Sequence, residues 1–501
     1  SNDILNDITN DTPNDTSSTI PHPTPHQTSN DTPHQTSNDT PHTTPEIPPH
    51  ATHNATHNDT LDYVGFKYGN PAESPTGTDA ETAYGISAQQ RVHTAIFGLP
   101  GCGKSSIISL LAYQNIIRGE GLMVIDPHGE LIRTIMSMVP QKRHKDVIYV
   151  NPASLYRYGT TVQINPLEVK SEQERYIVVM AFVSMLYNLY KDSWGPRLET
   201  VLRNAANAAV ESGKSRMQVI SALITDESAR AEILDGVASK SVRHFWQEIF
   251  QKQYARDAGS SAYNKMDKIL ATPTVAAIFD TDKSSISMQD VMRDKRMLLV
   301  DLSTGASDDI AEFLGSIFLN MLYIDAKKRL DLEGEQTSDN RFYVYVDEAH
   351  MFSSLTMSEM LRALRKFGVR VTLATQTASA FDDDFAKSIT GLCKTLITGR
   401  CDQYTAGLLK TVMGVSSDVM QTLPDHTFTM SSDEAGVRAK AVMRSRPVPL
   451  PGRKVTKWED LAEYSSKLWG SEINLERYIP SSKSGKLLFS PIEACIIHML
   501  E

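Results

Sequence analysis

The chain contains 501 residues, of which 40% are hydrophobic and 22% are charged, and its formal net charge is −10. This length is sufficient for one large or two medium-sized globular cores. The negative charge argues against a protein that coats nucleic acid over its whole surface, so any contact with phosphate backbones must come from local basic patches. Four cysteines without paired metal-ligand spacing indicate a reducing, cytoplasmic compartment: Cys102, Cys393, Cys401 and Cys495.

The first 60 residues are a polar repeat, in which the sequence TPHQTSND of residues 24–31 recurs at 32–39. Such a tract cannot bury enough apolar surface to offset the entropy of ordering it, so we expect a disordered N-terminal tail. A linker rich in Pro, Gly and Thr follows at 61–90. The longest apolar stretch, 176–190, is shorter than the roughly 20 residues that span a bilayer, so we expect no integral membrane segment.

Short apolar runs that alternate with helical patterns indicate an α/β fold with a mostly parallel sheet and flanking helices. The predicted strands form two groups, at 94–97, 122–125 and 147–150, and at 297–302, 342–346, 369–374 and 396–398. Between the groups, residues 171–275 show helical periodicity, which predicts an inserted all-helical domain. The core is therefore expected at 91–170 and 276–451, with a final hairpin at 426–430 and 439–444, followed by a C-terminal helical extension at 452–501.

The segment from Gly98 to Ser105 reads GLPGCGKS, a complete phosphate-binding loop between an apolar strand and a helix. Glycines let backbone N–H groups surround phosphates at a helix N-terminus, Lys104 reaches the β- and γ-phosphates, and the Ser105 hydroxyl binds Mg²⁺. We therefore expect ATP and Mg²⁺ as cofactors. The expected nucleotide-binding residues are Gly98, Leu99, Pro100, Gly101, Cys102, Gly103, Lys104, Ser105 and Ser106. Because Cys102 lies beside a helix N-terminus, we also expect a favoured thiolate that is open to alkylation.

A second motif, FYVYVDEAH at 342–350, is an apolar strand that ends in two carboxylates. Ligands bind at the carboxyl edge of a parallel sheet, so we expect Asp347 to hold the Mg²⁺ shell and Glu348 to orient and deprotonate the attacking water. Gln376 ends the strand at 369–375 and is suited to bridge the water and the γ-phosphate. The segment before that strand is strongly basic, which also suits a solvated helix face: Arg362, Arg365, Lys366 and Arg370.

Taken together, these motifs resemble the HerA/FtsK superfamily, and most closely the type IV secretion coupling-protein branch (TraD/TraG-like) of hexameric DNA-pumping ATPases. The resemblance also rests on VIDPHG at 124–129, INPL at 164–167, WGPR at 194–197, RKFG at 365–368 and GR at 399–400. It implies a RecA-like P-loop NTPase core with a helical insertion, six subunits around a channel, and an ATP site completed by an arginine of the neighbouring subunit. Arg365 matches the position of that arginine, and Arg400 is the second candidate.

The resemblance implies an ATP-hydrolysing DNA translocase, stimulated by sequence-tolerant binding of DNA in the ring channel and assisted by a secretion, nuclease or relaxase partner. Lys104, Glu348, Gln376, Arg365 and Arg400 are then the expected catalytic residues, and Ser105 and Asp347 the expected metal ligands. Two alternatives stay open. One is a P-loop ATPase that energises protein secretion or pilus assembly without DNA. The other is a scaffold that binds ATP as a switch, against which the intact Glu348 argues.

Overall fold

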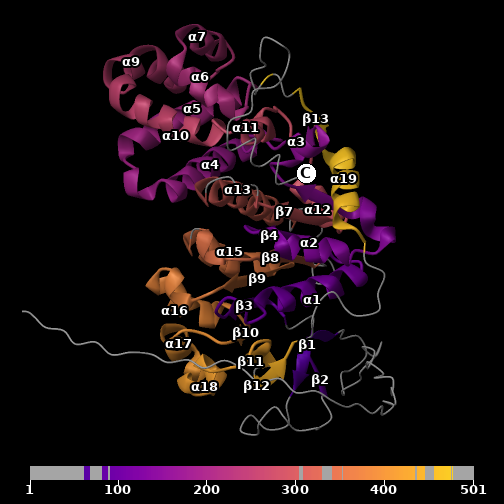
Figure 1. The fold of residues 1–501 in the computed structure, drawn as a ribbon. Helices are drawn as coiled ribbons and strands as arrows, with labels where there is room; N and C mark the ends of the chain where they lie inside the picture. The colour runs from indigo at the N-terminus through magenta and orange to yellow at the C-terminus, as the bar shows by residue number, and fades with distance from the viewer. Residues whose placement is uncertain are drawn as a thin grey trace, which may run out of the picture. The chain divides into compact units, whose positions relative to one another are not determined.

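A computed structural model describes residues 61–67, 82–87, 91–303, 308–329, 341–352, 354–434, 437–445, 456–474 and 477 (Figure 1). The N-terminal tail expected to be disordered, 1–60, lies outside these residues. The strands are β1 (Leu61–Lys67), β2 (Thr82–Ser87), β3 (His93–Phe97), β4 (Gly121–Asp126), β5 (Val147–Val150), β6 (Thr160–Thr161), β7 (Met297–Asp301), β8 (Phe342–Val346), β9 (Val369–Thr375), β10 (Thr395–Thr398), β11 (Thr427–Glu434), β12 (Val437–Arg444) and β13 (Ser471–Glu472).

The core helices before and after the insertion are α1 (Lys104–Ile117), α2 (Glu130–Ser137), α3 (Ser154–Tyr158), α12 (Met288–Arg293), α13 (Asp308–Lys327), α15 (Ser354–Ala363), α16 (Asp383–Leu392), α17 (Gln403–Met413), α18 (Ser417–Gln421) and α19 (Trp458–Trp469). The insertion consists of α4 (Arg175–Leu189), α5 (Pro196–Glu211), α6 (Met217–Thr225), α7 (Glu227–Asp235), α8 (Lys240–His244), α9 (Phe250–Gln253), α10 (Ser260–Leu270) and α11 (Pro273–Phe279). Two π-helical segments, Phe245–Ile249 and Ala255–Gly259, flank α9.

One sheet of 11 strands organises the core, in the order β2-β1-β12-β11-β10-β3-β9-β8-β4-β7-β5. The strands from β10 to β5 pair in parallel, and each corresponds to a predicted apolar run. The predicted hairpin is also confirmed, as the antiparallel pair β11 and β12. The expectation of a mostly parallel α/β sheet with flanking helices is therefore correct.

Strands β1 and β2 were not predicted, because they lie in the segment expected to be a linker. They pair with each other in antiparallel register, with an irregularity between Tyr63 and Gly65. At its C-terminal end, β1 also joins the sheet through Phe66 and Lys67, which lie opposite β12. Their sequences, LDYVGFK and TAYGIS, each contain a glycine and lack a continuous apolar run, so neither has the signal of a buried strand.

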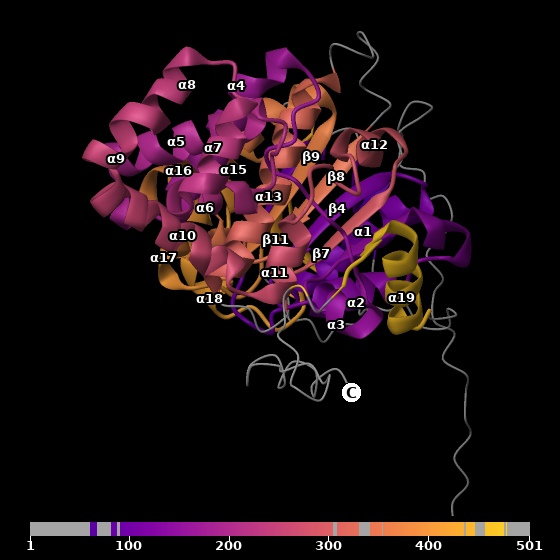
Figure 2. The ribbon, with the colours of Figure 1, turned by 90° about the horizontal axis from the view of Figure 1, so that it is seen from above.

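The central parallel strands are buried on both faces, as expected for a sheet covered by helices on each side. Side chains alternate between two hydrophobic clusters. Ala95 and Phe97 belong to the cluster shared with the insertion and α13, whereas Ile96 belongs to the cluster with α1 and α2. Figure 2 shows these layers, with α1, α2 and α19 on one side of the strands and the insertion on the other.

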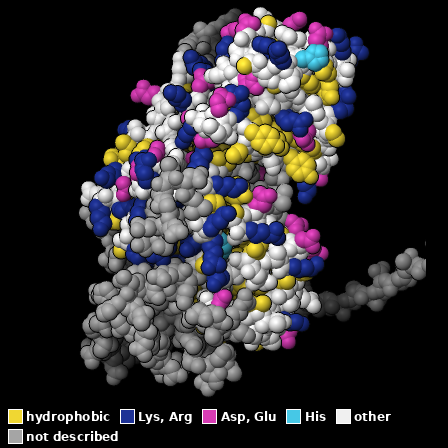
Figure 3. Space-filling view, turned by 180° about the vertical axis from the view of Figure 1, so that it is seen from behind, with side chains coloured by type: hydrophobic (Ala, Val, Ile, Leu, Met, Phe, Trp, Pro, Cys, Tyr) yellow, Lys and Arg dark blue, Asp and Glu magenta, His cyan; other side chains and the backbone are white. Residues whose placement is uncertain are grey.

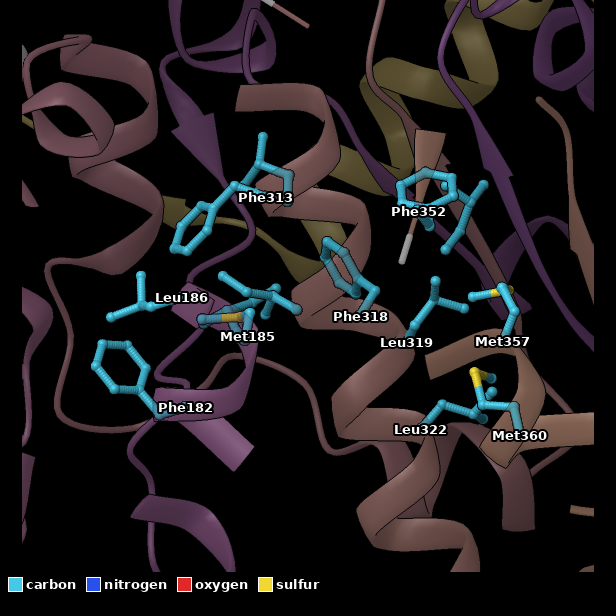
Figure 4. Packing of buried hydrophobic residues seen from close by; sticks show 14 of the residues in the cluster. Phe182, Met185, Leu186, Phe313, Phe318, Leu319, Leu322, Phe352, Met357 and Met360 are labelled. Atoms are coloured by element: carbon cyan, nitrogen blue, oxygen red, sulfur yellow. The ribbon is translucent and has the colours of Figure 1, made fainter. Parts of the chain in front are cut away.

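The helical insertion is joined to the core by a continuous apolar contact. In Figure 4, Phe182 and Leu186 of α4 face the phenylalanines of α13, and α13 in turn faces Met357 and Met360 of α15. Gly315 of α13 lies against Phe352, because a Cβ atom at this position would come within 2.3 Å of the Phe352 ring. Any side chain at Gly315 would therefore force Phe352 or α13 to move.

The helix α19 lies within 452–501, where a C-terminal helical extension was expected, and it covers β5 at the edge of the sheet. Ser465 satisfies two backbone groups of that edge strand. Its Oγ accepts a hydrogen bond from the Tyr149 N–H at 2.8 Å and donates one to the Val147 carbonyl at 2.8 Å. An edge strand otherwise offers such groups to other chains. This contact explains why a helix so far along the chain is part of the core.

We predict that Ser465→Ala lowers the free energy of unfolding by about 1–3 kcal/mol, because it leaves a buried donor and a buried acceptor unpaired. Urea denaturation followed by far-UV circular dichroism measures the change. Ser184→Ala, at an exposed serine of α4, is the matched control and should shift stability by no more than about 0.5 kcal/mol. Equal effects from the two variants would contradict the role given to Ser465.

Candidate nucleotide-binding and hydrolysis site

The phosphate-binding loop connects β3 to α1 at the carboxyl edge of the sheet. Gly103 caps α1 with φ of 102°, and a Cβ atom there would lie 2.6 Å from the His426 ring, so only glycine fits. No side chain caps this helix, and its first turn contains no acidic residue. The N-terminal N–H groups and the positive end of the helix are therefore available to an anion.

Lys104 lies beneath this loop. Its side chain is buried, and Nζ donates to the Gly98 carbonyl at 2.7 Å. The Ser105 side chain is exposed at the start of α1, and Ser106 is partly exposed. A buried ammonium close to free helical N–H groups has the chemistry needed to hold the phosphates of a nucleotide.

Hydrogen bonds beyond the strand ends bring the other expected residues to the same edge. The Gly98 N–H donates to the Thr375 carbonyl at 3.3 Å, which aligns the ends of β3 and β9. The Asp347 N–H donates to the Ile125 carbonyl at 3.0 Å, which aligns the ends of β8 and β4. Gln376, which follows β9, therefore stands between the phosphate-binding loop and the carboxylates that follow β8.

Asp347 is a buried carboxyl whose pKa is raised to about 6. Burial is the main cause, and the nearby Asp126 and Glu348 carboxylates add to it, while Lys104 opposes it. Its Oδ1 accepts from the Glu348 N–H at 3.0 Å. A divalent cation would relieve this charge, and carboxylate and hydroxyl oxygens are ligands that suit Mg²⁺.

The donor set fits Mg²⁺ better than a metal held only by protein. Within the described part of the chain, no group of three or more His, Cys, Asp or Glu side chains could hold a metal ion. Mg²⁺ usually keeps several waters and binds through one or two carboxylates together with substrate phosphates. Asp347 and Ser105 are therefore sufficient for a nucleotide-dependent magnesium site.

Glu348 is held in a strained and specific position. Its backbone has φ of 43° in the left-handed region, and its side chain is buried. Oε1 accepts from Gln376 Nε2 at 3.0 Å, whereas the buried Oε2 accepts no hydrogen bond. His350 Nδ1 lies 3.3 Å from Oε2, outside hydrogen-bonding geometry. Oε2 is thus the free oxygen that can accept a proton from water.

Two residues at the same edge of the sheet were not singled out as site residues from the sequence. His350 contacts Thr375 Oγ1 at 3.2 Å as well as approaching Glu348, and therefore links β8 to β9. Asp301 ends β7 and accepts from the Tyr149 hydroxyl at 2.8 Å. Its place at a strand end, like that of Asp126 and Asp347, is a signal that could have identified it.

The two candidate arginines lie at opposite edges of the sheet. Arg400 follows β10 at the carboxyl edge, where its carbonyl accepts from the Leu99 N–H at 2.8 Å and its guanidinium pairs with Asp425 at 3.0 Å. Arg365 lies in the 3₁₀ turn η7 (Leu364–Phe367) before β9, at the amino edge, with an exposed side chain. The structure therefore does not bring Arg365 and Arg400 into one site.

The expectation for Cys102 is wrong. The side chain is fully buried and its pKa is raised, chiefly by burial, which outweighs the opposing effect of Lys104. Sγ packs beneath the loop, since a Cβ atom at Gly98 would lie 2.5 Å from it and one at Gly399 would lie 3.0 Å from it. Cys102 is therefore a packing residue of the loop, and its thiol is not a favoured site of alkylation.

A cleft of about 1080 Å³ opens next to the Glu348 and Gln376 pair. Its other walls come from the insertion, including Tyr187 and Lys191, and from α13, including Glu312. Burial and the Asp309 carboxylate raise the pKa of Glu312 to about 7. Glu348 and Gln376 therefore line a cavity that both the core and the insertion help to form.

We predict that Asp347→Asn stabilises the metal-free and nucleotide-free protein at pH 7 by about 2–3 kcal/mol, since a carboxyl with a raised pKa favours folding only while it is protonated. This gain should be absent below about pH 4, the unfolded pKa, should grow as the pH rises from about 4 to about 6, and should be constant above about 6. Thermal unfolding at several pH values measures it. Asp384→Asn, at an exposed carboxylate, is the control, and a pH-independent effect of Asp347→Asn would refute this explanation.

Solved structures share this fold. The bacterial conjugative coupling protein TrwBΔN70, unbound, has 16% sequence identity and a TM-score of 0.52, over 72% of this chain and 87% of that one. TrwB in complex with ADP and Mg²⁺ has 18% identity and a TM-score of 0.52, over 72% and 86%. VirB4 of Thermoanaerobacter pseudethanolicus has 13% identity and a TM-score of 0.51, over 77% and 96%. At these identities the likeness concerns the fold alone.

The sequence comparisons identify the family. No curated protein matches the chain. The family model of the type IV secretion-system coupling protein DNA-binding domain, however, matches residues 84–457, which include both motifs, the insertion and nearly all of the sheet. Among the described residues, no helix is both long and apolar enough to cross a membrane. The resemblance seen in the motifs is thus confirmed, and the chain belongs to the type IV secretion-system coupling protein DNA-binding domain family.

Proposed function

We propose that this protein hydrolyses ATP to move DNA as a ring-shaped translocase of the coupling-protein type. The observation that carries the hydrolytic part is the Glu348 carboxylate, which is fixed through Oε1 by Gln376 and keeps Oε2 free. Family membership supports the DNA part, because the matching model describes a DNA-binding domain. The solved TrwB complex with ADP and Mg²⁺ supports the same choice of cofactors.

In the proposed reaction, the N-terminus of α1 and Lys104 bind the nucleotide phosphates. Ser105 and Asp347 would hold Mg²⁺, which neutralises charge on the phosphate oxygens when it is bound. Glu348 Oε2 accepts the proton of the attacking water, and Gln376 keeps the carboxylate oriented towards it. A fixed carboxylate beside the phosphates favours hydrolysis over transfer to another acceptor.

The positions of the arginines support an assembly of several copies. Arg365 is too far from the phosphate-binding loop of its own chain, because it lies at the other edge of the sheet. We assign it to the ATP site of a neighbouring subunit in a homo-hexamer, where such an arginine contributes about 10³–10⁵ in rate. Arg400, which lies against its own loop, is assigned to the nucleotide of its own chain.

We predict that Glu348→Gln lowers kcat for ATP hydrolysis by about 10²–10⁴, the usual contribution of a general base, while ATP binding is retained. Steady-state phosphate release and titration with a fluorescent ATP analogue measure the two quantities. Glu359→Gln, at an exposed glutamate of α15, should leave both unchanged. Turnover of Glu348→Gln at the parent rate would remove Glu348 from the mechanism.

We predict that linear DNA stimulates ATP hydrolysis and that stimulation weakens as salt rises, because phosphate contacts release counterions. The ATPase rate of the full chain, with and without DNA at low and moderate salt, tests this, with light scattering to follow assembly. Hydrolysis that ignores DNA would favour the alternative of an ATPase that energises protein secretion. Nucleotide binding without hydrolysis would favour the switch.

A further inference from the structure

A dense group of cations lies at the amino edge of the sheet, opposite the phosphate-binding loop. Its members, hereafter the arginine cluster, come from the start of β8, the end of α15, η7 and β9: Arg341, Arg362, Arg365, Lys366 and Arg370. Among the described residues, none of the five forms an ion pair, in a chain whose net charge is −10. This arrangement concentrates positive charge where no carboxylate of the described chain neutralises it.

Two arginines of the helical insertion are paired with carboxylates. Arg197 pairs with Asp257 at 2.9 Å, and Arg216 pairs with Asp282 at 2.8 Å. Over the insertion, at the top of Figure 3, Lys and Arg side chains are accordingly interspersed with Asp and Glu. Arg230 of the insertion also lacks an ion pair with any described residue, so what distinguishes the arginine cluster is the number of cations gathered within one short part of the amino edge.

Two members of the cluster have buried nitrogens without acceptors. Nε and Nη1 of Arg341 and Nε of Arg370 are closed to solvent and make no hydrogen bond. Arg370 Nη1 donates to the Arg365 carbonyl at 3.2 Å. A buried donor without a partner costs about 1–3 kcal/mol, and more when it is charged. This cost disappears when an ion or a water molecule from outside the folded chain supplies the missing acceptor.

The neighbouring titratable groups feel this positive charge. Burial lowers the pKa of Arg370, and the charges of Arg341, Arg365 and Arg91 lower it further. The pKa of His93 falls to about 3, mainly through burial and then through Arg370 and Arg365. Both shifts are in the direction expected for guanidinium groups that lie close to one another.

We propose that Arg341 and Arg370 form an anion site, next to Arg365, that binds a phosphate group. Guanidinium groups present paired N–H donors that match phosphate oxygens, so a bound phosphate would satisfy the orphaned nitrogens and relieve the repulsion. The nucleotide of the same chain is excluded as its source, because that nucleotide binds at the opposite edge of the sheet. The phosphate belongs either to a DNA backbone or to ATP held by a second copy of this chain.

The site itself is tested with inorganic phosphate and the full chain. Phosphate should raise the Tm of the parent protein more than the Tm of Arg341→Gln or Arg370→Gln, whereas phosphate bound at the P-loop raises all of them equally. Without phosphate, the two Gln variants should have a higher Tm than the parent, because repulsion is removed. Arg362→Gln, at an exposed arginine of the same segment, is the control and should keep the parent response.

Either of two results would overturn the site. The first is an equal phosphate response in the parent and in both Gln variants. The second is a lower Tm of both Gln variants in the absence of phosphate, together with a Tm of Arg341→Lys equal to that of the parent. This result would show that the positive charges stabilise the fold without an anion. The phosphate experiment does not depend on ATP hydrolysis or DNA binding, so its failure is separate from failure of the proposed function.

Identification of the phosphate source rests on the proposed function. If DNA is the source, the slope of log affinity against log salt for a labelled oligonucleotide should fall by about one for each arginine removed. If a neighbour's ATP is the source, DNA affinity should stay unchanged and Arg341→Gln should lose ATPase activity. A mixture of the Arg341→Gln and Glu348→Gln chains should then hydrolyse ATP faster than either alone. No change in either measurement would overturn the proposal.

Discussion

The parallel pairing of β3, β9, β8, β4 and β7 is the constraint on which the rest of the molecule depends. Parallel strands end at one edge, so this pairing alone gathers the phosphate-binding loop, Gln376 and the carboxylates that follow β8, β4 and β7. The amino ends of the same strands also meet at one edge of the sheet, which places Arg341 and Arg370 close together. Parallel strands need long crossover connections, and the helical insertion lies in the one between β5 and β7. One hydrogen-bond ladder thus separates a negatively charged edge from a positively charged edge.

The parts of the fold that were predictable are those with a strong local signal. The parallel strands are continuous apolar runs because helices cover both of their faces, and the phosphate-binding loop has a fixed spacing. Strands β1 and β2 lack such runs, and only their pairing partners define them. Asp347 and Glu348 stand out because they end an apolar strand. The burial of Cys102 could not be predicted from the sequence, because it depends on Gly399. This residue closes the space around the thiol but is remote in the sequence.

The carboxyl edge of the sheet contains several features that lower the stability of the fold. Glu348 adopts a left-handed backbone conformation, Asp347 is a buried carboxyl near two others, and Glu348 Oε2 lacks a donor. Each feature costs free energy in the ligand-free chain, and each is of the kind that bound nucleotide, metal or water offsets. The surrounding sheet tolerates these costs because its strands are buried on both faces and hydrogen-bonded along their whole length. Strain is therefore concentrated in the few residues to which we assign the binding and hydrolysis of the nucleotide.

The close fit between Gly315 and Phe352 has a mechanical consequence. Phe352 follows Glu348 by four positions and touches α13 at a point where not even a methyl group could be inserted. Packed interiors have little compressibility, so a shift of the catalytic segment cannot be absorbed at this contact. It must be passed to α13 and from there to α4, whose side chains interlock with it. The small size of Gly315 thus allows a rigid, close-packed contact between the segment that follows Glu348 and the helices of the insertion.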